Sequence, residues 1–175
     1  MRSMSYEKSA GAIIYCIKQE EGKRPVPYFL LLRYPGGYWE FARGHMEEGE
    51  REHATAKREI QEETGLTGLQ FLSGFREQYR FHFKRSGKAI TKDAVLYLAQ
   101  APRWRVRVSE EHFGFAWMPY SDALAHLHFE NSKDVLQKAH VFLQRRRKSD
   151  KEKQPQNGSP KRNAAAHGDG STKRS

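Results

Sequence analysis

The chain has 175 residues, of which 37% are hydrophobic and 30% charged, and it carries a formal net charge of +10 at pH 7. This composition is apolar enough for one core but polar enough that part of the chain is expected to stay unfolded, so we predict one domain with appendages. The single cysteine, Cys16, excludes an intrachain disulfide and favours a reducing compartment. No apolar run approaches the roughly 20 residues that cross a bilayer, and no secretion signal is recognisable, so we expect a cytoplasmic protein without membrane contact.

Short apolar runs bounded by turn residues alternate with segments of helical periodicity. Gly65 stands where a helix would end, and an apolar stripe at i, i+3 and i+4 spacing marks the last helix. In chain order the patterns predict strands at residues 9–18 and 28–33, a helix at 50–63, strands at 69–84, 89–100 and 113–119, and helices at 121–127 and 132–147. Elements in this order predict an α/β fold, a sandwich with helices on both faces of a mixed β-sheet.

The positive charge is concentrated at the C-terminal end. Residues 145–175 hold ten Lys and Arg against three Asp and Glu, and no large apolar residue. We therefore expect a folded domain over residues 4–144 and a disordered basic tail over residues 145–175. The charge of the tail suits weak contact with RNA or another nucleic acid, and a solubilising extension without a specific partner is the alternative.

Residues 47–63 concentrate seven glutamates against three basic residues, although the whole chain is basic. On a helix, Glu59, Glu62 and Glu63 project over one arc of the surface, because they are three and four residues apart. Their mutual repulsion and their place near the negative end of the helix dipole, before Gly65, both destabilise the helix. A solvated acidic surface is one explanation. The other is a hard divalent cation, Mg²⁺ or Mn²⁺, which takes carboxylate ligands and often binds together with substrate phosphates.

Arg58 has two groups of carboxylates within reach. It lies one helical turn from Glu62, and it can contact Glu50 if the preceding loop folds over the helix. A guanidinium fixed there would orient carboxylates that must stay ionised. His53 lies on another side of the helix, where we expect it to pack rather than to bind a ligand.

The order of these residues resembles the Nudix box, G-x5-E-x7-R-E-U-x-E-E-x-G-U, in which U is a bulky aliphatic residue. All nine defined positions are matched, by Gly44, Glu50, Arg58, Glu59, Ile60, Glu62, Glu63, Gly65 and Leu66. The resemblance implies the α/β/α sandwich of that family and hydrolysis of a nucleoside diphosphate linked to another group. It also implies that the three helix glutamates hold the catalytic metal ions with the backbone of Gly44, while Glu50 and Arg58 brace the loop and the helix.

Residues 9–144 also resemble one branch of that family, the asymmetrical diadenosine tetraphosphate hydrolases, in stretches such as YWEFARGHMEEGE, SEEHFGFAWM and FENSKDVLQKAHVFL. Members of the branch usually have Trp-x-Phe/Pro-Pro-Lys-Gly-His, where this chain has Ala42 and Arg43 in place of proline and lysine. The resemblance implies Mg²⁺-dependent cleavage of diadenosine tetraphosphate-like dinucleotides to ATP and AMP. The two departures leave an RNA 5′-end pyrophosphohydrolase, or a hydrolase of another nucleotide-diphosphate linkage, as alternatives.

The same resemblance suggests functional residues outside the box. Glu111 is expected to act as the general base or as an additional metal ligand, with a solvated turn carboxylate as the other explanation of this residue and a box glutamate as the alternative base. Arg43 and His45 flank Gly44, and Lys92 matches a lysine of the branch. We expect these three cations to contact the phosphates of the substrate.

Tyr79, Phe81 and Phe83 alternate along a predicted strand and therefore face one side of it, where a packed core is the usual explanation. By resemblance, Phe81 aligns with an aromatic residue that stacks on adenine, and Phe129 aligns with its partner across the ring, with Tyr79 as a substitute. Base stacking contributes about 1–3 kcal/mol per base in single-strand binding proteins. We therefore expect the small-molecule substrate to be a nucleotide polyphosphate. We expect the protein to be a monomer or a weak dimer.

A nucleotide-binding or RNA-binding module without catalysis is the second alternative. The complete set of box residues argues against it, because binding alone does not require Arg58 and three glutamates together.

Overall fold

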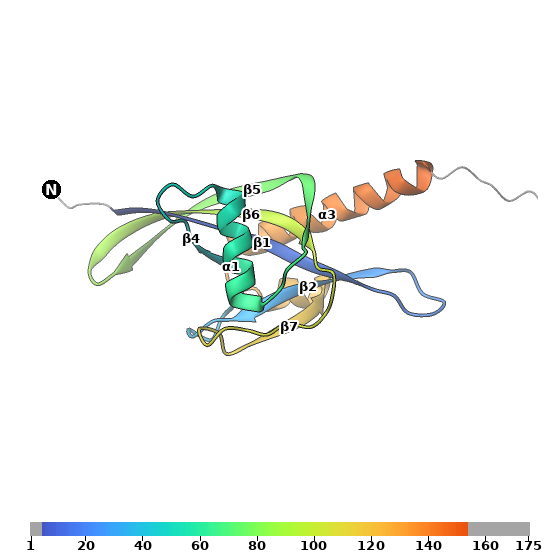
Figure 1. Cartoon of the computed structure of the whole chain (residues 1–175), viewed down its shortest axis with the longest axis horizontal. Helices are drawn as coiled ribbons and strands as arrows, with labels where there is room; N and C mark the ends of the chain where they lie inside the picture. Colours follow the sequence, from blue (N-terminus) through green and yellow to red (C-terminus); the bar gives the residue numbers. More distant parts are fainter. Residues whose placement is uncertain (1–4, 154–175) are drawn as a thin grey trace, which may run out of the picture.

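The computed structural model describes residues 5–153, with side chains placed through residue 150, and shows a central sheet between two helical layers (Figure 1). Helix α1 covers one face of the sheet, and α2 and α3 pack on the other. The predicted α/β/α sandwich is confirmed. The elements are β1 (Ser5–Lys18), β2 (Val26–Arg33), β3 (Trp39–Glu40), β4 (Ala42–His45), α1 (Glu52–Thr64), β5 (Gln70–Arg85), β6 (Lys88–Gln100), β7 (Gly114–Pro119), α2 (Tyr120–His126) and α3 (Glu130–Lys153).

The sheet is mixed, and β1 is its central strand. The strand order is β3-β2-β1-β6-β5, with β1 and β6 parallel and the other pairs antiparallel. Along its other edge, β1 pairs first with β4 and then with β2, while β7 pairs with β2. The approach of β4 is close, because a Cβ on Gly11 would overlap the backbone of Ala42 and Arg43. This pairing places the start of the box, Gly44, beside β1.

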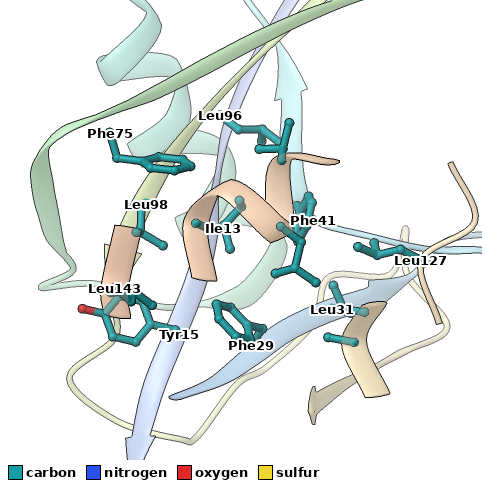
Figure 2. Packing of buried hydrophobic residues seen from close by; sticks show 14 of the residues in the cluster. Ile13, Tyr15, Phe29, Leu31, Phe41, Phe75, Leu96, Leu98, Leu127 and Leu143 are labelled. Carbon is teal, nitrogen blue, oxygen red and sulfur yellow. The ribbon is translucent and has the colours of Figure 1, made fainter. Parts of the chain in front are cut away.

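Two apolar clusters hold the layers together, one on each face of the sheet. Ile13 and Tyr15 of β1 point toward α2 and α3, while Ile14 and Cys16 point toward α1, because side chains alternate along a strand. Figure 2 shows the first cluster, in which Phe75 and other side chains converge under the helices. Fully burying one such side chain contributes about 1.5–3 kcal/mol. Cys16 is buried, as expected for a small apolar residue rather than a reactive thiol.

Most of the predicted elements are confirmed, within a few residues at their ends. The strands at residues 39–40 and 42–45 were not predicted, because segments this short form only by pairing with β1 and β2. The turn between β5 and β6 is a two-residue hairpin turn: Ser86 and Gly87 both have positive φ, as such a turn requires.

The prediction that disorder begins at residue 145 is wrong for the first nine residues of the tail. Helix α3 continues to Lys153. Arg and Lys are good helix formers, and near a helix C-terminus their charge is favourable to the helix dipole. The rest of the predicted tail, residues 154–175, lies outside the described residues. Between residues 5 and 153, no helix combines the length and the apolar character needed to cross a bilayer.

Asp93 on β6 joins three strands through its carboxylate. One oxygen accepts a hydrogen bond from Arg80 Nε at 2.6 Å, and the other accepts from Arg80 Nη2 at 3.0 Å and from Tyr6 and Gln78 at 2.9 Å each. These bonds, led by those from Arg80, lower the pKa of Asp93 to about 2. The neighbouring residue, Lys92, therefore faces the opposite side of the sheet.

Asp93→Asn is expected to destabilise the fold by about 1.5–3 kcal/mol at pH 7, the usual contribution of hydrogen bonds to a charged group. Because the pKa in the folded state lies below the usual 3.8, the stabilisation is present above pH ~4 and is lost as the pH falls toward about 2. Urea unfolding across this range should show a smaller acid loss in the variant than in the wild type. Asp134→Asn, an exposed carboxylate on α3, is the matched control. Equal midpoints for all three proteins at pH 7 would contradict the assignment.

Candidate active site

One side of helix α1 is fixed in the core, and of its three box glutamates Glu62 is exposed, Glu59 is half-buried and Glu63 is buried. Ala56 and Ile60 are completely buried against the sheet, and His53 packs edge-on against Phe71, as expected for a packing residue. The helix ends at Gly65, which adopts the predicted left-handed conformation with φ of 66°.

Arg58 connects the loop before α1 to the acidic face of the helix. Its Nε and Nη2 donate to the two oxygens of Glu50 at 2.8 and 2.9 Å, and its Nη1 donates to Glu59 at 2.8 Å and to Glu62 at 3.2 Å. Its Nη2 also donates to the carbonyl of His45 at 3.0 Å. The paired guanidinium lowers the pKa of Glu50 to about 2, so this carboxylate stays ionised. The expected contacts of Arg58 with Glu50 and Glu62 are both present.

Glu63 is the most buried carboxylate of the group, with 5% of its surface exposed. Burial, and then repulsion from Glu59, raises its pKa to about 8. His112 Nε2 lies 3.5 Å from one oxygen of Glu63, but burial lowers the pKa of His112, so the imidazole supplies no counter-charge at neutral pH. The other oxygen of Glu63 has no hydrogen-bond partner among the residues described.

Glu111 reaches the same region from the loop between β6 and β7. The loop is anchored there, because the backbone N–H of Ser109 donates to the carbonyl of Glu63 at 3.1 Å. The charge of Glu111 contributes to the raised pKa of both Glu59 and Glu63, behind the effect of burial. The predicted extra carboxylate is therefore close to the box carboxylates and is solvent-exposed.

These carboxylates fit a divalent cation, although no three His, Cys, Asp or Glu side chains between residues 5 and 150 form a ready metal site. Arg58 donates a hydrogen bond to one oxygen of Glu59 and to one oxygen of Glu62. Two observations favour the fit. Glu63 has an unpaired buried oxygen, and Gly44 lies so close to the Glu59 carboxylate that a Cβ would overlap it. An oxygen-only donor set of this kind suits Mg²⁺ or Mn²⁺.

A cavity of about 590 Å³ opens beside this group, between β5, the Tyr34–Tyr38 turn and the start of α3. It gathers five of the six side chains predicted to bind substrate. Its lining residues are Tyr34, Tyr38, Glu40, Arg43, Tyr79, Phe81, His82, Phe83, Arg85, Lys92, Phe129, Asn131 and Ser132.

Two cations in the cavity are incompletely paired. Arg43 places its guanidinium 5.5 Å from the centre of the Phe81 ring, and its buried Nε has no hydrogen-bond partner among the residues described. Burial, with a smaller effect from nearby Arg43, lowers the pKa of Lys92. Its Nζ lies 3.6 Å from a carboxylate oxygen of Glu7. A bound anion would give Arg43 Nε a hydrogen-bond partner and would offset the cost of burying the charge of Lys92.

Aromatic rings form the remaining walls. Tyr79, Phe81 and Phe83 line the cavity in succession from β5, with ring centres about 6 Å apart, so their shared side is a cavity wall, and Tyr79 also packs against the apolar cluster under α2 and α3. Phe129 lines it from the start of α3, where it meets Tyr38 edge-on at 5.3 Å. Both members of the predicted base clamp therefore line the same space.

His45 is the exception among the predicted substrate-binding residues. It does not line the cavity; its carbonyl instead accepts a hydrogen bond from Arg58. Its exposed side chain lies at the end of β4, so phosphate contact by His45 stays a prediction.

Glu40 and Ser132 join the walls of the cavity and were not predicted as site residues. Glu40 is 1% exposed; one oxygen accepts from the N–H of Phe41 at 2.9 Å and the other accepts from Ser132 Oγ at 2.6 Å. Tyr79 Oη lies 3.5 Å from the same Ser132 oxygen. A glutamate inside an apolar stretch, YWEF, was the only available signal. His112 and the two tyrosines of the YPGGY turn were also missed.

Comparison with known protein families matches residues 8–139 to the NUDIX domain. The chain is 34% identical over 121 residues to a curated rat (Rattus norvegicus) protein, bis(5′-nucleosyl)-tetraphosphatase [asymmetrical], covering 66% of this chain and 80% of the relative. A Caenorhabditis elegans protein of the same name is 30% identical over 139 residues, covering 78% of this chain and 96% of the relative.

Solved structures agree with the fold. The crystal structure of a C. elegans Ap4A hydrolase binary complex matches with a TM-score of 0.63 and 30% identity, covering 79% of this chain and 98% of the other. A MutT protein from Methanosarcina mazei Go1 matches with a TM-score of 0.58 and 22% identity over 81% of this chain and 97% of the other, a likeness of fold alone.

Proposed function

The chain belongs to the Nudix family of pyrophosphohydrolases, and on that basis we propose that it cleaves diadenosine tetraphosphate-like dinucleotides to ATP and AMP with Mg²⁺. One observation carries the proposal: Arg43 and Gly44 are adjacent on β4, so the aromatic, cationic cavity and the carboxylates of α1 share a border. A substrate with a base at one end and a long phosphate chain fits such a site.

The phosphate chain would run from the cavity toward α1. Arg43 and Lys92 supply positive charge along the cavity wall, and Phe81 and Phe129 supply faces for one base. Mn²⁺ or Mg²⁺, when bound by Glu59, Glu62 and Glu63, would supply charge neutralisation and acidify water.

The reaction is the addition of water across one P–O–P linkage. The water oxygen bonds to phosphorus as the bridging oxygen leaves with the other product, and the water gives up a proton. Glu111 is our candidate to accept this proton, because it is exposed beside Glu59 and Glu63 without an Arg58 contact. Arg58 keeps Glu50 ionised and holds the loop against the helix.

The test is product analysis with diadenosine tetraphosphate and Mg²⁺. We expect equal amounts of ATP and AMP; ADP alone would indicate symmetrical cleavage and overturn the proposal. Phe81→Ala and Phe129→Ala should each raise KM about 5- to 150-fold, since stacking contributes about 1–3 kcal/mol per base. Phe115→Ala, an exposed aromatic on β7 outside the cavity, is the control and should leave KM unchanged.

A further inference from the structure

A second cationic surface lies at the other side of the acidic helix. The segment at residues 101–109, between β6 and β7, passes the C-terminal end of α1 (Figure 1). It is pinned there because the Arg107 N–H donates to the carbonyl of Thr64 at 3.0 Å and the Ser109 N–H donates to that of Glu63 at 3.1 Å. The surface is therefore held at a fixed place relative to the catalytic carboxylates.

The packing of this segment sends three arginines to the same side. Val106 is buried in the cluster under α1, and Trp104 packs against Trp117 with ring centres 5.2 Å apart. The arginines between and beside these apolar residues are exposed. They line a hollow of about 400 Å³ together with Thr64 and Gly65, and they are Arg103, Arg105 and Arg107.

Two of these three arginines, Arg105 and Arg107, are not explained by contacts among the described residues. Arg103 donates to the carbonyl of Gly65 at 3.3 Å, which caps the end of α1. In the described part of the chain, none of the three forms an ion pair with a carboxylate, and Arg105 and Arg107 make no side-chain hydrogen bond. Proximity to the helix dipole contributes only about 0.3–1 kcal/mol per cation and falls off within one turn.

We propose that Arg103, Arg105 and Arg107 bind the phosphates of a single-stranded nucleic acid. Guanidinium groups recognise phosphate oxygens in pairs, which distinguishes this surface from one built of lysines. Trp104, between Arg103 and Arg105 in the sequence, does not line the hollow but is 39% exposed, so part of its ring is free to stack on an unpaired base.

The position of the three arginines relative to Glu111 determines where one end of a bound strand would lie. Arg107 is four residues from Glu111, so at most about 14 Å of chain separates the row from the catalytic group. A strand bound along the row would place one end at the carboxylates, where a 5′-polyphosphate could be hydrolysed. This last step rests on the proposed function, whereas binding of the strand does not.

The experiment measures binding of 3′-labelled 12-nucleotide single strands, RNA and DNA, to the full chain by fluorescence anisotropy at increasing salt. Arg105→Gln combined with Arg107→Gln is expected to weaken binding at least 10-fold, and to reduce the slope of log K against log salt by about 1.4, since each phosphate contact contributes ~0.7. The control combines Arg24→Gln with Lys88→Gln, which removes the same charge from exposed positions elsewhere. Lysine at both positions should restore most of the slope.

Several results would overturn the proposal: no binding by the wild type, equal losses in the Arg105/Arg107 and control variants, or equally good competition by an acidic peptide. Binding of RNA and DNA alike supports it and shows that the sugar is not read. Circular dichroism melts verify that each variant is folded. In turnover, the ratio of 5′-triphosphorylated RNA to diadenosine tetraphosphate hydrolysis should fall in the Arg105/Arg107 variant. If the wild type did not hydrolyse diadenosine tetraphosphate, the proposed function would be refuted, whereas the result of the binding experiment would still hold.

Discussion

Replacing Glu63 with glutamine is expected to lower kcat for the dinucleotide about 10²- to 10⁴-fold, because the variant loses a carboxylate that would hold the metal ion, and the charge of that ion stabilises the transition state by several kcal/mol. The carboxylate is buried, has an unpaired oxygen and lies among the other acidic groups, so it has no role in stabilising the fold. Glutamine keeps its shape and removes its charge. Steady-state kinetics at saturating Mg²⁺ measure the effect.

The same variant should change the pH dependence of stability in metal-free buffer. Because the pKa of Glu63 is about 8 in the folded chain, the folded state keeps a proton that the unfolded state releases above pH 4.5. The wild type should therefore lose stability as the pH rises from about 4.5 to 8, by up to about 5 kcal/mol, and Glu63→Gln should not. Thermal melts with EDTA measure this, and Mg²⁺ should restore wild-type stability at pH 8.

Glu47→Gln is the control for both measurements, because Glu47 is an exposed glutamate of the box loop. A Glu63→Gln variant with wild-type turnover would show that Glu63 is neither ligand nor base. A metal-free wild type with equal stability at pH 5 and pH 8 would show that Glu63 is solvated when folded.

The acidic part of the site was predictable because it is local in the sequence. Glu59, Glu62 and Glu63 lie within two turns of one helix, and helical geometry alone brings them to one surface. The contact between Arg58 and Glu50 was predicted on one further condition, that the loop folds back over the helix. The two hydrogen bonds between these residues confirm it.

The cavity was predicted only in part, because it is built from distant segments. Phe81 and Lys92 are directly opposite on β5 and β6, a register fixed by the Ser86–Gly87 turn, and Phe129 arrives from the start of α3. Alternation along a strand told us that Tyr79, Phe81 and Phe83 share a side, but not whether that side is covered. Whether other residues cover that side depends on where α3 begins.

Glu40 illustrates what local patterns miss. Its neighbours in sequence are Trp39 and Phe41, and its hydrogen-bond partner Ser132 is 92 residues away. Only the packing of α3 on β3 makes a buried carboxylate tolerable there, since a buried acceptor without a partner costs about 1–3 kcal/mol or more. The end of α3 was missed for a related reason, because composition suggested disorder where helix propensity and dipole favour continuation.

Replacing Arg58 with methionine should both destabilise the chain and reduce activity. Its guanidinium makes two hydrogen bonds to Glu50 and one each to Glu59 and Glu62. Because the Arg58 side chain is 27% exposed, solvent screens part of this network, and we expect a loss of about 2–3 kcal/mol rather than the 3–5 of a fully buried pair. Without the cation, the carboxylates repel one another and the loop carrying Glu50 is released.

Arg58→Lys separates the two effects, because lysine keeps the charge but cannot bridge Glu50 and the helix glutamates at once. It should recover most of the lost stability in urea unfolding, yet keep a kcat about 10- to 100-fold below wild type, the usual effect of losing a group that orients metal ligands. Arg51→Lys, one residue before α1 and exposed, is the matched control and should change neither quantity. If Arg58→Lys were fully active, charge alone would suffice, and the bonds from Arg58 to Glu50 would have no part in placing the helix glutamates.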